Sequence, residues 1–278
     1  MLDILIAVLF GLVEGITEWL PVSSTGHMIL LEEFIKFEGV SENFFGMFDV
    51  VIQLGAIMAV VILYWKKIFP FEITKKNAIK VEIKKDIFTL WFKILVACVP
   101  AAIIGILFDD ILDKYLYNGY VVAIALIVFG IAFIVVENWN KGKKARVNKL
   151  TELTYQTAAI IGIFQVLAAV FPGTSRSGAT IVGALLIGVS RTVAAEFTFF
   201  LAIPVMFGAS LLKLVKFGLA FTGLEIAVLL VGMIVAFVVS MVVIKFLMAY
   251  IKRNDFKVFG WYRIVLGAIV LAYFLIFR

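Results

Sequence analysis

Long apolar stretches separated by short charged connectors dominate the chain. Six of them approach the roughly 20 residues that a helix needs to cross a bilayer, and they cover residues 47–65, 89–108, 119–136, 195–212, 223–247 and 261–277. Two more apolar regions, 2–38 and 154–190, are interrupted midway by Pro, Gly, Ser and Thr, at 21–26 and 172–178. We therefore expect an all-α polytopic membrane protein with six transmembrane helices and two re-entrant helix-loop-helix hairpins.

The composition agrees with this pattern. Of the 278 residues, 64% are hydrophobic and only 16% are charged, and the mean hydropathy is +1.12, which is more apolar surface than a soluble core buries. We expect a single integral membrane domain over residues 1–278. The net charge of +6 reflects basic residues in the connectors, so we interpret it as a signal of orientation and expect no nucleic-acid partner.

The charges of the connectors predict which side of the membrane each one faces. Connectors 66–86 and 138–149 are rich in Lys and Arg, whereas 109–118 carries three aspartates against one lysine. Because basic connectors stay on the cytoplasmic side, the first two and the later basic connector, 252–257, should lie inside. The first hairpin, 2–38, then enters from outside. We expect a multi-pass protein of the cytoplasmic (inner) membrane whose active site faces outside.

The two interrupted regions resemble each other, which indicates an internal repeat. Aligning Pro21 with Pro172 also matches Ala7 with Ala158, Gly11 with Gly162, Glu14 with Gln165, Ser23 with Thr174, and Ser24 with Ser175. The repeat halves are approximately 1–140 and 152–278. Because each half would hold one hairpin and an odd number of crossings, the halves should have inverted topology. The two interrupting loops should then meet near the membrane midplane.

Two carboxylates precede the first interruption. Glu14 and Glu18 are four residues apart and so lie on one face of a helix. Such a pair repels unless a proton or a hard cation sits between the carboxylates, and carboxylates together with substrate phosphate are a common way to hold Mg²⁺. The alternative is that one or both face lumenal water or pair with a basic residue.

Hydroxyl side chains and one arginine surround the two interruptions. They are Ser23, Ser24 and Thr25 in the first, and Thr174, Ser175, Arg176 and Ser177 in the second. The helices that begin there direct free N–H groups and partial positive charge at the loops, which favours an anion. Plain N-capping is the alternative explanation for the hydroxyls. Capping does not explain Arg176, whose planar guanidinium can donate to two phosphate oxygens at once.

His27 is the only histidine in the chain. Because an imidazole titrates near neutral pH, His27 beside these groups suits a general base, a general acid or a nucleophile. A structural histidine is the alternative. A single histidine excludes phosphatases that form a phosphohistidine and use a second histidine as the acid.

The two motifs resemble a known family. Residues 14–27, Glu-Gly-Ile-Thr-Glu-Trp-Leu-Pro-Val-Ser-Ser-Thr-Gly-His, and residues 172–180, Pro-Gly-Thr-Ser-Arg-Ser-Gly-Ala-Thr, are similar to those of undecaprenyl pyrophosphate phosphatases of the bacitracin-resistance type. The resemblance covers essentially the whole chain, including 188–191 and 195–198. It implies an integral membrane enzyme that removes the terminal phosphate of a polyprenyl diphosphate lipid, recycles the carrier for cell-wall synthesis, gives bacitracin resistance and requires a divalent cation.

The motifs and the resemblance together assign roles to site residues. The expected ligands of the cation, Mg²⁺ or Ca²⁺, are Glu14 and Glu18. The expected catalytic residues are Glu18, Ser24, His27 and Arg176. The residues expected to bind the substrate phosphates are Ser23, Thr25, Ser175, Arg176, Ser177 and Thr180.

Three alternatives stay open at this point. Either Ser24, activated by His27, attacks phosphorus, or His27 activates a water molecule directly. A transporter or flippase of a lipid phosphate or another anion is the alternative function, because inverted repeats with broken helices are a common transporter plan. The oligomeric state is open between a monomer and a homodimer.

Overall fold

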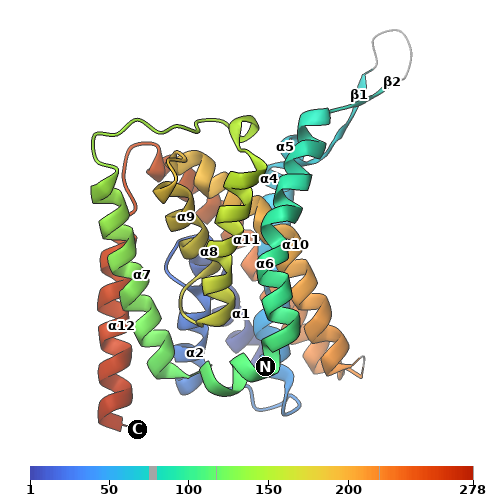
Figure 1. Cartoon of the computed structure of the whole chain (residues 1–278). Helices are drawn as coiled ribbons and strands as arrows, with labels where there is room; N and C mark the ends of the chain where they lie inside the picture. Colours follow the sequence, from blue (N-terminus) through green and yellow to red (C-terminus); the bar gives the residue numbers. More distant parts are fainter. Residues whose placement is uncertain (75–79, 117, 219, 278) are drawn as a thin grey trace.

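Helices follow one another along almost the whole chain (Figure 1). The computed structural model describes residues 1–74, 80–116, 118–218 and 220–277. Its elements are, in order, α1 (Leu2–Thr17), α2 (Ser24–Phe34), α3 (Phe44–Val51), α4 (Gln53–Leu63), α5 (Trp65–Ile68), β1 (Phe71–Thr74), β2 (Lys80–Ile83), α6 (Lys85–Leu116), α7 (Gly119–Trp139), a 3-10 helix (Leu150–Glu152), α8 (Tyr155–Val170), α9 (Arg176–Leu186), α10 (Arg191–Phe217), α11 (Gly223–Ile251) and α12 (Lys257–Phe277).

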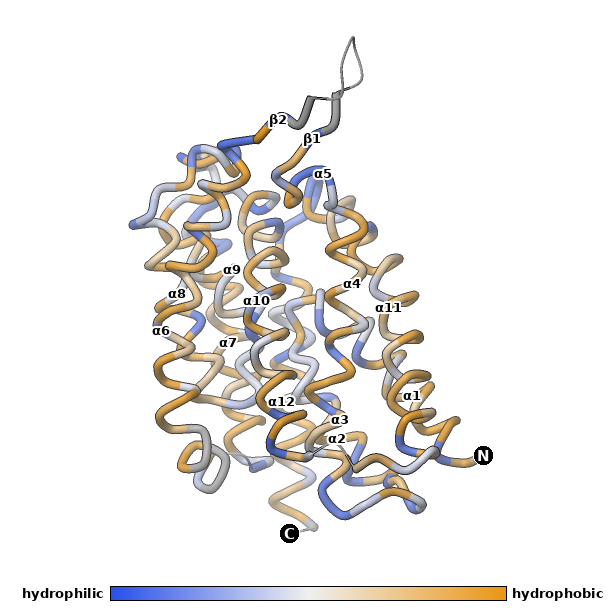
Figure 2. Tube along the Cα trace, turned by 90° about the vertical axis from the view of Figure 1, so that its right-hand side faces the viewer, coloured by the Kyte–Doolittle hydropathy of each residue, from blue (hydrophilic) through white to orange (hydrophobic). Residues whose placement is uncertain are grey.

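Six segments of the described chain are long and apolar enough to cross a membrane. They are Phe44–Leu63, Lys85–Phe108, Gly119–Trp139, Arg191–Phe217, Gly223–Ile251 and Lys257–Ile276. Each coincides with one of the six predicted spans, so the prediction of a multi-pass membrane protein is confirmed. Large apolar side chains remain exposed on these helices, such as Ile106 at 74% and Val242 at 66%. Figure 2 shows largely hydrophobic helices with hydrophilic segments toward the two ends of the molecule.

Two connectors differ from the prediction. Helix α6 continues to Leu116, so most of the connector predicted at 109–118 is helical, because neither Gly nor Pro occurs between Gly105 and Gly119 to end the helix earlier. The connector 66–86 contains an antiparallel hairpin of β1 and β2, which the sequence did not predict. Its Lys75 and Lys76 lie outside the described residues.

The basic connectors gather at one end of the molecule. Figure 1 shows the β-hairpin, the connector from α7 to α8 and the connector from α11 to α12 at the top of the view, whereas both chain termini lie toward the bottom. These are the three connectors that the charge pattern predicts to lie on one side of the membrane. The molecule therefore has a basic end and a terminal end.

A serine with positive φ begins the second helix of each interrupted region. Ser23 (φ 77°) caps α2 by accepting from the Gly26 N–H at 3.3 Å, and Ser175 (φ 69°) caps α9 by accepting from the Gly178 N–H at 3.1 Å. The helices thus start inside the predicted interruptions. The caps pair Ser23 with Ser175, so the alignment that matched Ser23 with Thr174 is one residue out of register after the prolines.

Glycines allow the long helices to approach backbone to backbone. In α1, a Cβ on Gly11 would lie 2.7 Å from the Gly232 carbonyl oxygen of α11. Helices α7 and α12 pack antiparallel along most of their length, where a Cβ on Gly130 or Gly260 would lie 2.7 Å from the carbonyl oxygen of the other. Small residues at such crossings are typical of helix association in membranes.

We predict that Gly130→Ala destabilises the protein, because its methyl group has no room against the Gly260 carbonyl. Overpacking of this kind costs about 1–3 kcal/mol, so the midpoint of thermal unfolding in detergent should fall. Gly105→Ala on α6 is the matched control, since a Cβ there meets nothing within 4 Å. Equal unfolding midpoints for the two variants would contradict the close α7–α12 packing.

Candidate functional site

The carboxylate of Glu18 connects the two broken regions. Ser24, the first residue of α2, donates its hydroxyl to Glu18 Oε2 at 2.6 Å. Arg176, the first residue of α9, donates from Nη2 to Glu18 Oε1 at 2.9 Å. The ion pair is largely out of solvent, because the Arg176 and Glu18 side chains are only 11% and 6% exposed. The first residues of the two helices that follow the breaks therefore meet on one carboxylate.

Neighbouring contacts hold Glu18 and Arg176 in place. The adjacent Trp19 is fully buried and packs edge-on against Phe199 of α10, with ring centroids 5.3 Å apart. The Ser177 hydroxyl donates to the Glu18 carbonyl at 3.2 Å, and Arg176 Nη1 donates to the Thr198 carbonyl at 2.9 Å. The geometry of the ion pair is thus set by α1, α9 and α10 together.

Arg263 of α12 supports both breaks from within the protein. It is fully buried, and its guanidinium donates to the carbonyls of Pro21 at 3.3 Å, Gly173 at 2.9 Å and Thr174 at 2.8 Å. These carbonyls belong to the non-helical turns, where no helix hydrogen bond reaches them. The sequence analysis missed Arg263, although an arginine within the apolar stretch 261–277 is a recognisable signal of function.

A cavity of about 240 Å³ opens beside the ion pair. Its polar lining comprises Glu18, Ser24, Thr25, Gln53, Ser175 and Arg176. The remaining lining is mostly apolar, from α6, α8 and α10, and includes Leu112, Val170 and Met206. A second cavity of about 620 Å³ shares Thr25 and Gln53 with the first and reaches the start of α3 and the end of α10. The first cavity thus combines a polar side at the breaks with an apolar side, and the second cavity has a mixed lining of polar and apolar residues.

The predicted phosphate-binding residues divide into two groups. Thr25, Ser175 and Arg176 line the cavity beside Glu18. Ser23 and Ser177 are buried and engaged as described above, in the α2 cap and on the Glu18 carbonyl. Thr180 is also buried, with its hydroxyl 2.9 Å from the Thr198 hydroxyl. Three of the six predicted residues therefore reach the cavity.

His27 is directed at Tyr262 of α12 rather than at Ser24. Its Nδ1 lies 2.7 Å from the Ser23 carbonyl and its Nε2 lies 2.7 Å from the Tyr262 hydroxyl, and the two rings are nearly parallel, at 6°. Because a carbonyl only accepts, the contact with Ser23 assigns the hydrogen of the neutral ring to Nδ1, and Nε2 then accepts from Tyr262. Tyr262 was not among the predicted site residues, because a tyrosine in an apolar span is common and gives no signal of function.

Glu14 provides a test of whether the residues present suit a divalent cation. It is fully buried, and neither carboxylate oxygen has a hydrogen-bond partner in the described part of the chain. Glu18, Asp49 and Arg176 lie within electrostatic range of it. Unpartnered buried carboxylate oxygens are costly unless a proton or a cation compensates them, so Glu14 fits a ligand role.

The donor set also suits a cation that is shared with phosphate. Among the residues that the structure describes, no group of three or more His, Cys, Asp or Glu side chains could form a closed metal site. Mg²⁺ is commonly held by one or two carboxylates, with substrate phosphate and water completing its coordination. Glu14 suits that arrangement, whereas both carboxylate oxygens of Glu18 already accept hydrogen bonds, from Ser24 and Arg176, so that Glu18 would share a cation only through its remaining lone pairs.

Comparison with known proteins places the chain among close relatives. It matches the family model of the bacitracin resistance protein BacA over residues 7–269. An undecaprenyl-diphosphatase of Desulfitobacterium hafniense is 65% identical over 274 residues, which are 99% of this chain and 97% of that relative. Undecaprenyl-diphosphatase 1 of Clostridium acetobutylicum is 63% identical over 275 residues, 99% and 98% of the two chains. An undecaprenyl-diphosphatase of Enterococcus faecalis is 62% identical over 270 residues, 97% and 96% of the two chains.

We predict that Arg263→Met strongly destabilises the protein, because it leaves the carbonyls of both breaks buried without a donor. Each unsatisfied group costs about 1–3 kcal/mol, so the unfolding midpoint in detergent should fall by more than for Gly130→Ala. Arg263→Lys, which keeps the charge but has fewer donors, should be intermediate. Arg253→Met removes an exposed arginine from the α11–α12 connector and should leave the midpoint unchanged. A wild-type midpoint for Arg263→Met would rule out the supporting role.

Proposed function

Since the chain belongs to the bacitracin resistance protein BacA family, we propose that it is a membrane phosphatase acting on undecaprenyl diphosphate. It releases inorganic phosphate and returns the lipid monophosphate for cell-wall synthesis, which accounts for bacitracin resistance. The observation that carries this proposal is the contact of Ser24 and Arg176 with the single carboxylate of Glu18 beside a cavity. A nucleophile, a base and a phosphate-binding cation thereby meet in one place.

In the proposed reaction, Ser24 is the nucleophile and Glu18 is its base. As a bond forms between Ser24 Oγ and the terminal phosphorus, the hydroxyl proton passes to Glu18 Oε2, 2.6 Å away. The bond from phosphorus to the bridging oxygen breaks, and the lipid monophosphate leaves. Of the two routes that the sequence left open, this geometry favours attack by Ser24, with Glu18 in the role that had been assigned to His27.

Hydrolysis of the phosphoserine completes the cycle. Glu18 first loses its proton to water and then carries one proton of the attacking water to Ser24 Oγ as the bond from Oγ to phosphorus breaks. His27, held between the Ser23 carbonyl and Tyr262, fixes the first turn of α2 and hence the direction of Ser24.

Positioning and electrostatics supply most of the rate enhancement in phosphoryl transfer. Arg176, Thr25 and Ser175 line the cavity and provide donors for the phosphate oxygens, and the N-termini of α2 and α9 add partial positive charge. Glu14 and Glu18 would hold the divalent cation, Mg²⁺ or Ca²⁺. When bound, that cation would neutralise charge on the leaving phosphate.

We also propose that the two interrupted regions are re-entrant hairpins of an inverted repeat, with halves near 1–140 and 152–278. Helix α1 packs along α11 and α8 packs along α6, so the hairpin of each half lies on a helix of the other. At both aligned glycines an added Cβ would meet a carbonyl oxygen of the facing helix, that of Gly232 for Gly11 and that of Ala97 for Gly162. This reciprocal packing supports a two-fold relationship between the halves.

The proposed site faces the outside of the cytoplasmic membrane. The larger cavity is lined by residues at the start of α3, such as Asn43 and Gly46, and at the end of α10, such as Lys213. These segments lie toward the terminal end, away from the basic connectors (Figure 1). Since basic connectors stay in the cytoplasm, the cavity opens on the opposite side.

The central test is phosphate release from farnesyl diphosphate by detergent-purified protein with Mg²⁺. We predict that Ser24→Ala lowers kcat by at least about 10³-fold and Arg176→Lys by about 10²-fold, because the first removes the nucleophile and the second the planar fork. Thr157→Ala, an exposed hydroxyl near the start of α8, is the control and should retain activity. Lipid transport into vesicles without any hydrolysis would instead favour a transporter.

Glu14→Gln tests the proposed cation site. The substitution keeps the size of the side chain but removes its charge, so the Mg²⁺ concentration for half-maximal activity should rise about tenfold or more. Activity should still be lost in EDTA and recovered at high Mg²⁺. An unchanged Mg²⁺ dependence in a variant with normal thermal stability would exclude Glu14 as a ligand.

Tyr262→Phe tests the orientation of His27. Loss of the hydroxyl leaves Nε2 without its partner. Because His27 then positions Ser24 less well, we expect kcat to fall about tenfold, which is less than the loss expected when a general acid or base is removed. The KM should change little. The pH profile should also change, because the environment of the imidazole is altered. Tyr250→Phe on α11 is the matched control. Identical kcat and pH profiles for Tyr262→Phe and wild type would mean that Tyr262 does not position His27.

A further inference from the structure

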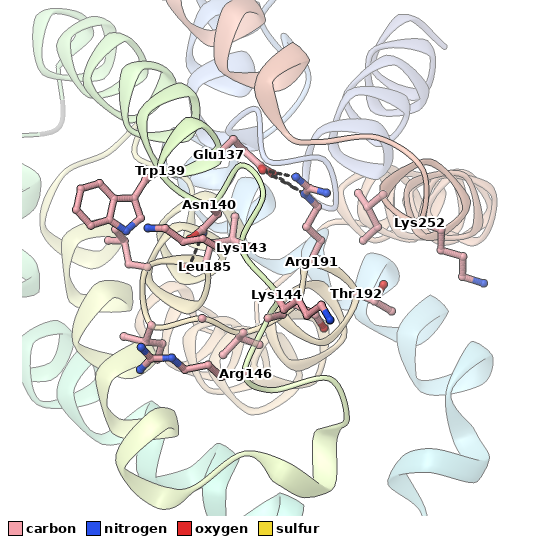
Figure 3. Close-up of a pocket in the computed structure, with 17 residues that line it drawn as sticks. Glu137, Trp139, Asn140, Lys143, Lys144, Arg146, Leu185, Arg191, Thr192 and Lys252 are labelled. Carbon is pink, nitrogen blue, oxygen red and sulfur yellow. Dashed lines mark hydrogen bonds and ion pairs between the residues drawn. The ribbon is translucent and has the colours of Figure 1, made fainter.

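A third cavity, a polar pocket, lies at the basic end, and it shares no lining residue with the cavity beside Glu18. Its volume is about 450 Å³, and it is enclosed by the end of α7, the connector that follows, the α9–α10 turn and the end of α11. Five cationic side chains line it: Lys143, Lys144, Arg146, Arg191 and Lys252. Figure 3 shows Arg191 turned toward Glu137, Lys144 near Thr192 on the same side, and the Arg146 side chain extending to the other side of the connector.

The only carboxylate in the lining is already neutralised. Glu137 is 2% exposed. It forms a bidentate ion pair with Arg191, whose Nε lies 2.8 Å from Oε1 and whose Nη2 lies 2.5 Å from Oε2. It also accepts from the Phe256 N–H at 3.0 Å. No carboxylate in the described chain pairs with Lys143, Lys144 or Arg146. The pocket therefore carries uncompensated positive charge, which favours an anion.

Hydrogen bonds fix the backbone of the connector that lines this pocket. The connector is fixed to the α9–α10 turn by hydrogen bonds from the Arg146 N–H to the Gly188 carbonyl at 2.8 Å and from the Ser190 N–H to the Val147 carbonyl at 2.9 Å. Asn140 adds a bond from its side chain to the Leu185 carbonyl at 2.9 Å. The backbone that carries three exposed basic side chains, Lys143, Lys144 and Arg146, is thus fixed at the edge of the pocket.

The rim of the pocket has the character of a membrane interface. Trp139 and Leu186 line it and are 66% and 47% exposed, and Lys143 Nζ lies 4.1 Å from the centre of the Trp139 ring. Exposed tryptophan and lysine are typical of the level at which lipid head groups lie. Binding of free phosphate would explain the cationic side chains alone. Binding of a lipid also explains the exposed apolar side chains of Trp139 and Leu186 at the rim.

We propose that this pocket binds the phosphate head group of an anionic membrane lipid, in the leaflet at the basic end. Lys144 and Arg146 supply positive charge from the connector that lines the pocket, and the acyl chains lie over Trp139 and Leu186. A lipid phosphomonoester, with two negative charges, matches the uncompensated charge better than a zwitterionic lipid does. The pocket is separate from the proposed catalytic cavity, and its occupancy does not depend on the phosphatase proposal.

The test is native mass spectrometry of the full-length protein in detergent with dioleoyl phosphatidic acid. We expect one tightly retained lipid, whose affinity falls about tenfold or more in the double variant Lys144→Ala/Arg146→Ala. Lys141→Ala/Lys149→Ala is the matched control, since both residues are exposed on the same connector and outside the pocket lining. It should bind like wild type, and dioleoyl phosphatidylcholine should not bind.

Several outcomes would overturn the proposal. Equal losses in the two double variants would show diffuse attraction to a basic surface instead of a pocket. Displacement of the lipid by millimolar inorganic phosphate would identify free phosphate as the ligand. Two control measurements show whether the variants are folded: the unfolding midpoint without added lipid and the rate of phosphate release. Each should equal that of the wild type. Restored binding in Lys144→Arg/Arg146→Lys would confirm that charge at these positions is responsible.

Discussion

A helix that stops inside a membrane protein leaves backbone N–H and carbonyl groups that water cannot satisfy, and the rest of this structure depends on how two such breaks are stabilised. The Glu18 carboxylate accepts from the first residue of each following helix, Ser24 and Arg176. The buried Arg263 donates to carbonyls of both turns. One anion and one cation thus hold together two segments that are far apart in the sequence.

The contacts that stabilise the two breaks also place reactive groups, such as the Ser24 hydroxyl, beside the cavity. The serine caps have positive φ, at Ser23 and Ser175, a conformation that costs of the order of 1–3 kcal/mol for a residue other than glycine and that persists because the surrounding contacts compensate it. The same contacts aim the Ser24 hydroxyl at Glu18 and turn two helix N-termini toward the cavity. Structural needs of a broken helix and the proposed phosphoryl chemistry are therefore met by the same side chains.

Much of the architecture could be predicted from the sequence because lipid imposes a strong constraint. Continuous apolar stretches identified the six helices of the described chain that are long and apolar enough to cross a membrane, and Pro, Gly, Ser and Thr located the two interruptions. The extension of α6 and the β-hairpin were missed, because a polar helix end and a short hairpin carry weak local signals. The residues around Glu18 could be listed from motifs, but their partners could not. That Glu18 binds Ser24 and that His27 turns to Tyr262 follow from how α2 and α12 pack, which no spacing encodes.

The most direct test of the proposed mechanism is the stereochemical course at phosphorus. A polyprenyl diphosphate whose terminal phosphorus is made chiral by sulfur and oxygen isotopes would be hydrolysed in isotopically labelled water, and the configuration of the released thiophosphate would be determined. Attack by Ser24 followed by attack by water gives two inversions, so the mechanism predicts net retention of configuration. Net inversion would mean that water attacks directly, and it would contradict the assignment of Ser24, held by Glu18, as the nucleophile.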